Sequence, residues 1–109
     1  MSFLSKILTK TITNNFLQIK GIDGYKALAL CVTKDSTAPA ILSNSSAVTI
    51  GGKNAEGVTI KIGGKFFYSC GDGDIDGLVI TAPIGCTIKM AVSKKGGVDI
   101  SAMSLMIND

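Results

Sequence analysis

Short apolar segments separated by glycine-rich turns make up most of this chain. Val58, Ile60 and Ile62 alternate with Thr59 and Lys61, which predicts a strand with one buried and one exposed face. Turn signals recur about every 8–12 residues, a spacing typical of all-β sandwiches and barrels. We therefore expect an all-β fold, a small antiparallel β-sandwich or barrel of about seven short strands. The segments expected to form these strands are residues 25–33, 47–50, 58–62, 65–70, 77–82, 86–93 and 98–107.

Three of these segments carry more specific expectations. The segment Tyr25–Thr33 is almost continuously apolar, so both of its faces should be covered. Gly63-Gly64 is a hairpin signal between the segments 58–62 and 65–70. The segment Val98–Ile107 alternates in character and is predicted to be the last strand.

The N-terminal segment differs from the rest of the chain. Phe3, Leu4, Ile7 and Leu8 have the spacing of one face of two helical turns, which predicts a short helix over residues 2–9. An irregular or extended piece follows it. We expect two parts, an N-terminal arm of residues 1–20 and a β-domain of residues 21–109. The arm could pack on its own core, dock onto a neighbouring subunit or other structural protein through those four side chains, or contact a membrane surface, because lysines flank its apolar face.

The net charge of +3 is concentrated at the N-terminus. Residues 1–22 contain Lys6, Lys10 and Lys20 and no acidic residue, whereas the lysines and acids of residues 23–109 balance. Every basic residue is a lysine, so the chain lacks the side chain best suited to bidentate recognition of phosphates and guanines, and specific nucleic-acid binding is not expected. No apolar run reaches the roughly 18 residues that span a bilayer, and no secretory signal is recognisable. Synthesis in the cytoplasm is therefore expected.

The segment Gly71–Gly77 holds three carboxylates at alternate positions, Asp72, Asp74 and Asp76. Oxygens spaced in this way, with a glycine after the third, resemble the opening half of a calcium loop. The twelfth position of such a loop would supply a bidentate glutamate, but Pro83 stands there. Three interpretations remain: a solvated connection between strands, a Ca²⁺ site that is completed by backbone carbonyls, water or a second chain, or paired carboxylates for acid–base catalysis. A glycine-rich loop would hold catalytic carboxylates poorly.

The remaining candidate chemistry is sparse. Cys31, Cys70 and Cys86 form no C-x-x-C pair, so we interpret them as buried small apolar residues, with a single Cys70–Cys86 bridge as the alternative. The chain has no histidine to act as a general base and no arginine to hold an anion. We expect a protein without enzymatic activity and without a cofactor, apart from the possible Ca²⁺.

The style of residues 25–107 resembles small accessory structural proteins of phage and virus particles, such as capsid decoration, spike-base and minor capsid proteins. The stretches that carry the resemblance are VTIGGKNAEGVTIKIGG and ITAPIGCTIKMAVSKKGG. It implies a homo-oligomer, often a trimer or pentamer, that docks on a larger lattice in the virion after synthesis in the host cytoplasm. The alternative hypothesis is a β-sandwich binding module for a carbohydrate or a cell surface, with calcium held at residues 72–77.

Overall fold

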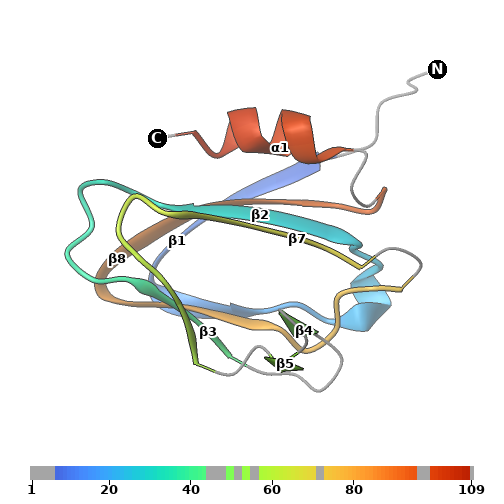
Figure 1. Ribbon diagram of the computed structural model, residues 1–109, viewed down its shortest axis with the longest axis horizontal. Coiled ribbons are helices and arrows are strands. Elements are labelled where there is room, and N and C mark those ends of the chain that lie inside the picture. The colour runs from blue at the N-terminus through green and yellow to red at the C-terminus, as the bar shows by residue number, and fades with distance from the viewer. Residues whose placement is uncertain are drawn as a thin grey trace.

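The protein is an antiparallel sheet curled into a half-barrel, with one short helix on its outside (Figure 1). The computed structural model describes residues 7–43, 49–50, 53–54, 57–70, 73–95 and 99–108. The expected all-β antiparallel fold is confirmed. The main sheet contains β1 (Ile7–Gln18), β2 (Ala27–Val32), β3 (Ala40–Ser43), β6 (Val58–Ile60), β7 (Lys65–Ser69) and β8 (Val79–Ser93). A separate two-stranded ladder, β4 (Thr49–Ile50) and β5 (Lys53–Asn54), a 3-10 turn η1 (Gly21–Asp23) and a helix α1 (Ile100–Met106) complete the described elements.

A long ribbon of β1 and β8 organises the sheet. β1 pairs with β8 along almost its whole length, from Ile7 opposite Ser93 to Gln18 opposite Val79. The pairing is interrupted between Thr13 and Asn15, and the ribbon bends there. The other edge of β8 pairs with β3 near its start and with β2 near its end. The ribbon therefore belongs to two facing layers at once.

We distinguish the two layers by whether α1 packs on their outer side. The helix-covered layer consists of β7, β2, the end of β8 and the start of β1, and α1 lies on its outer side (Figure 1). The second layer consists of β6, β3, the start of β8 and the end of β1. Apolar side chains from both layers fill the space between them, among them Leu28, Leu42, Ile80 and Ile88.

The connection between β6 and β7 runs from the edge of one layer to the edge of the other. The N–H of Gly64 donates to the carbonyl of Lys61 at 2.8 Å, so the predicted tight turn is present. The strands it joins do not form the predicted hairpin, however, because β6 pairs with β3 and β7 pairs with β2. Ile62, which we expected to face the core, lies in this turn and is 42% exposed.

β2 is covered on both faces, as its apolar sequence predicted. Leu28 and Leu30 point into the core between the layers. Ala27, Ala29 and Cys31 alternate with them and lie in a second cluster beneath α1. Their small side chains let the helix approach the sheet closely.

The C-terminal segment corrects a prediction. Ile100–Met106 is helical, so the strand expected over 98–107 is wrong for its described part, and Val98 lies outside the described residues. Met103 and Ile107 lie one helical turn apart and are fully buried against the small side chains of the sheet. Spacings of three and four fit the apolar positions of this segment as well as alternation does, and the contact with the sheet selects the helix. Within the described chain, no helix is both long and apolar enough to cross a membrane.

The start of the chain corrects a second prediction, that of a short N-terminal helix. Residues 7–9, the described part of the predicted N-terminal helix, belong to strand β1. From Ile7 onward the chain is part of the sheet, and Ile12 and Ile19 are buried in the main core. The alternation of Leu8, Lys10 and Ile12 with threonines explains the strand, since it places one side chain in every two on the core face.

Candidate functional site

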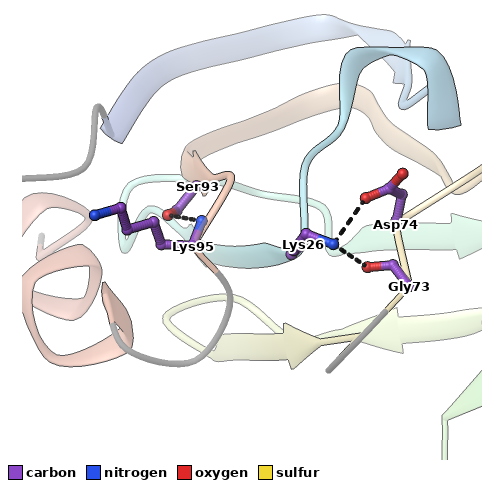
Figure 2. Close-up of polar contacts among 5 residues, drawn as sticks. All are labelled: Lys26, Gly73, Asp74, Ser93 and Lys95. Atoms are coloured by element: carbon purple, nitrogen blue, oxygen red, sulfur yellow. Dashed lines mark hydrogen bonds and ion pairs between the residues drawn. The ribbon is translucent and has the colours of Figure 1, made fainter.

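The acidic loop connects β7 to β8 and closes one end of the half-barrel. Figure 2 shows Lys26, which precedes β2, pointing toward this loop. Its ammonium lies 3.3 Å from Oδ1 of Asp74 and donates to the carbonyl of Gly73 at 3.4 Å. The backbone joins the same two segments, because the N–H of Cys70 donates to the carbonyl of Lys26 at 2.8 Å.

The second half of the loop is fixed more firmly than the first. Ile75 and Leu78 are fully buried in the main core. The N–H of Ile75 donates to the carbonyl of Tyr25 at 2.7 Å, and the N–H of Gly77 donates to that of Ile19 at 2.6 Å. Oδ1 of Asp76 accepts the N–H of Gly21 at 2.7 Å. The interpretation of residues 71–77 as a connection between strands is confirmed for its described part, and its isoleucine plugs the end of the core.

The proposed calcium ligands fit a cation poorly where they are described. Asp72 lies outside the described residues. Asp74 faces the Lys26 ammonium, and Asp76 is held by a backbone N–H of a different segment. Among the described residues, no group of three or more acidic or cysteine side chains could hold a metal ion. A cation would have to compete with a lysine for Asp74, so the Ca²⁺ site at Asp72, Asp74 and Asp76 stays a prediction.

The three cysteines are free thiols, so the alternative of a Cys70–Cys86 bridge is wrong. Cys31 and Cys86 are buried, as expected of small apolar residues, and Cys70 is half-buried beside the acidic loop. Burial raises the pKa of the Cys70 thiol, and the nearby Asp74 carboxylate adds to this, while a hydrogen bond with Tyr68 and the Lys26 charge act in the opposite direction. Burial also raises the pKa of Cys86. Neither thiol is activated as a nucleophile.

A buried hydroxyl next to a carboxylate is a second place where chemistry could be sought. Ser93 donates to Asp99. Its hydroxyl oxygen also accepts the backbone N–H of Lys95 at 3.0 Å (Figure 2). The hydroxyl is fully buried and already donates its proton to the carboxylate. This arrangement joins the end of β8 to the residue that precedes α1 and offers no reactive oxygen to a substrate.

Of the four predicted docking side chains, the structure describes Ile7 and Leu8, and these two do not share a face. Phe3 and Leu4 lie outside the described residues. Ile7 packs against the cluster beneath α1, whereas Leu8 pairs with Val92 on the core side and is 38% exposed. Consecutive residues of a strand point to opposite faces, so the helical face built from Ile7 and Leu8 together is wrong.

Sequence reasoning missed a cavity of about 370 Å³ at the open side of the half-barrel. We call it the mouth. Both ends of β1 line it, Leu8 and Lys10 from the helix-covered layer and Leu17 from the second layer. Met90 and Val92 of β8 line it as well and are buried. The signal that could have revealed it is the position of Lys10, a charged residue in an alternating run of apolar side chains.

No protein family, curated protein or solved structure matches this chain. Its function must therefore be inferred from its own features. Those features are the closed acidic loop, the edge strand β1 with its mouth, and the apolar side chains on the outer faces.

Proposed function

We propose that this chain is a non-enzymatic structural protein of a virus or phage particle, of the capsid-decoration, spike-base or minor capsid kind. It self-associates and docks on its partners through the N-terminal segment that carries Phe3, Leu4, Ile7 and Leu8. The observation that carries the proposal is the place of β1. This strand begins at Ile7, three residues after Leu4. Among the described residues it pairs with β8 alone, so its other edge is open to a further chain.

The outer face of the second layer supports self-association. Phe16, Thr81 and Ile41 lie opposite one another across three strands, and Phe16 is 64% and Ile41 37% exposed. The neighbouring row across the same strands is Gln18, Val79 and Ser43. None of these six side chains is charged. A second copy can therefore cover this face without taking any charge out of water. Symmetric oligomers commonly pair one such patch with the same patch of another copy.

The structure sets where the N-terminal segment can be cut. Removing residues 1–20 would delete β1 and with it the buried Ile12 and Ile19, so the loss of assembly would report unfolding. Removing residues 1–6 leaves the strand intact. A better-matched variant replaces Phe3 and Leu4 by serine, with Ser2→Ala/Ser5→Ala as the control in the same segment.

Light scattering on the full chain, the chain without residues 1–6 and both double variants tests the proposal. We expect an oligomer for the full chain and the control, and a smaller species for the other two with unchanged circular dichroism. If all four proteins are monomers at micromolar concentration, the proposed self-association is wrong. Co-sedimentation with liposomes that depends on Phe3 and Leu4, without any oligomer, would assign the segment to a membrane surface. Antibody labelling of purified particles from the source tests the virion location, and unlabelled particles would exclude it.

A further inference from the structure

Lys10 emerges on the core-facing side of the sheet. It lies opposite Met90, which in turn lies opposite Leu30 on β2. Residues directly opposite each other in a sheet share a face, and Leu30 is fully buried in the main core. The neighbours of Lys10 on that side of β1 are Leu8 and Ile12, both apolar. Lys10 itself is exposed, so its ammonium stays in water at the edge of this apolar face and can meet a ligand there.

The mouth gives Lys10 its surroundings. The cavity of about 370 Å³ falls in the size range of small-ligand pockets, about 300–1,000 Å³. Besides Lys10, it is lined by Leu17 and Ile19 on one side and by Met90 and Val92 on the other. Ile19, Met90 and Val92 are buried, so an apolar surface lies between the two layers and is reached from solvent past β1.

The charges of the mouth are separated along its length. Lys10 lies two residues from Leu8 on β1, which is about 6.6 Å along a strand. Asp23 and Tyr25 line the mouth at its other end. The N–H of Lys26, the residue after Tyr25, donates to the carbonyl of Ser93, which places Tyr25 beyond Val92 and away from Lys10. Among the described residues, the Lys10 ammonium has neither a hydrogen-bond partner nor an ion pair. At the far end the Asp23 carboxylate is accompanied by the Lys94 ammonium, which lies 5.6 Å from the centre of the Tyr25 ring. Lys10 is thus the cation of the mouth with no partner among the described residues, and this favours an elongated ligand whose negative group lies toward Lys10.

We propose that the mouth binds one alkyl carboxylate, with the carboxylate beside the Lys10 ammonium and the alkyl chain along the apolar side chains of β1 and β8. The carboxylate accepts a charge-assisted hydrogen bond from Lys10. The alkyl chain covers the apolar side chains of Met90 and Val92, and removing this apolar surface from water is favourable. At the other end Asp23 repels a carboxylate and the Lys94 ammonium already lies over the Tyr25 ring, so Lys10 is the favoured partner of the carboxylate. This inference is independent of the proposed function.

Calorimetric titration with decanoate, below its micelle concentration, tests the proposal on the full chain. We expect one decanoate per chain, weaker binding of decanol, and no gain in affinity for decyltrimethylammonium. Lys10→Met keeps the apolar stem and should weaken decanoate binding about tenfold while leaving decanol unchanged. Lys61→Met, in the exposed turn after β6, is the matched control and should bind decanoate as the native chain does.

Leu8→Trp provides a second test that does not alter charge. Leu8 is partly exposed at the rim, so a larger side chain there can fill the mouth without entering the packed core. It should reduce the affinity for both decanoate and decanol, and circular dichroism checks that the fold persists. Equal decanoate binding by the native chain and Lys10→Met, or no binding at millimolar decanoate, would overturn the proposal. An absence of binding at millimolar decanoate would fit a Lys10 whose role is to keep the exposed edge of β1 from pairing with other chains. Release of decanoate as the protein associates, seen by light scattering, would assign the mouth to a second copy and would also overturn it.

Discussion

Replacing Ile75 by alanine tests whether the acidic loop is a structural plug. Ile75 is fully buried, and its side chain lies in the main core, although it stands between two aspartates. The substitution removes three carbon atoms, which at about 0.8 kcal/mol each is about 2.4 kcal/mol before any cavity is counted. Core truncations of this kind cost about 2–5 kcal/mol in total. We therefore expect the free energy of unfolding to fall by about 3 kcal/mol.

Asp74→Ala in the same loop is the matched comparison. The ion pair with Lys26 joins two partly exposed side chains, 33% and 42% accessible, at 3.3 Å. Pairs of this kind contribute about 0–1 kcal/mol because water and salt screen them. The isoleucine should therefore outweigh the aspartate several-fold, the reverse of what a loop built around a metal ion would show.

Urea denaturation followed by circular dichroism measures both changes. With a slope of about 2 kcal/mol per molar, typical of small domains, Ile75→Ala should lower the midpoint by about 1.5 M and Asp74→Ala by less than about 0.5 M. The titrations are repeated with calcium and with a chelator. A loss below about 1 kcal/mol for Ile75→Ala, or a calcium-dependent stability that Asp74→Ala abolishes, would refute the plug and restore the loop as an ion site.

Three further changes probe other parts of the fold. In thermal melts, Gly85→Ala should lower the stability by at least about 1 kcal/mol more than Gly24→Ala does. Both glycines have positive φ (90° and 73°), but only a Cβ at Gly85 would collide with the Thr37 hydroxyl. Equal losses of stability would contradict this. Ala29→Leu should cost about 1–3 kcal/mol and speed amide exchange in α1, since Ala29 is fully buried beneath that helix; unchanged exchange would show that the helix does not depend on close approach. Cys70 should react with iodoacetamide more slowly than a free thiol at neutral pH, because burial raises its pKa. The raised folded-state pKa also favours the neutral thiol, so its contribution to stability is complete below the ordinary thiol pKa and is lost as the pH rises through the folded value, which pH-dependent urea titrations would measure.

Alternation and turns were sufficient to predict an antiparallel β fold but not every strand in it. β1 was expected as part of an N-terminal arm, and the segments 77–82 and 86–93, expected as two strands, belong from Val79 onward to the single strand β8. Tyr25–Thr33 was predicted to be covered on both faces because its run of apolar residues leaves no polar side, and β2 has that property. The segment 98–107 fits both periods over a short length. Only the small side chains of β2 and β8, such as Ala29 and Ala91, make a surface on which Met103 can pack as part of a helix.

The hairpin expected at Gly63-Gly64 failed for a related reason. The local signal fixed the turn, but strand partners depend on the whole sheet, and the bent ribbon of β1 and β8 separates β6 and β7 into different layers. At the candidate site, the aspartates drew attention because charge is easy to recognise. The residue that anchors the loop is Ile75, and its burial depends on a gap at the end of the core that no local pattern describes.

The ribbon of β1 and β8 also has a consequence for how the chain is made. Its register joins Ile7 to Ser93 and Gln18 to Val79, so β1 finds its partner only after all the residues between the two strands have been synthesised. Contacts between distant parts of a chain cost loop-closure entropy and slow folding. Until then, the nascent strand exposes an unpaired edge and its apolar side chains, which can pair with a neighbouring nascent chain. The same strand that we propose for assembly is thus the part of the molecule that a chaperone would have to protect during synthesis.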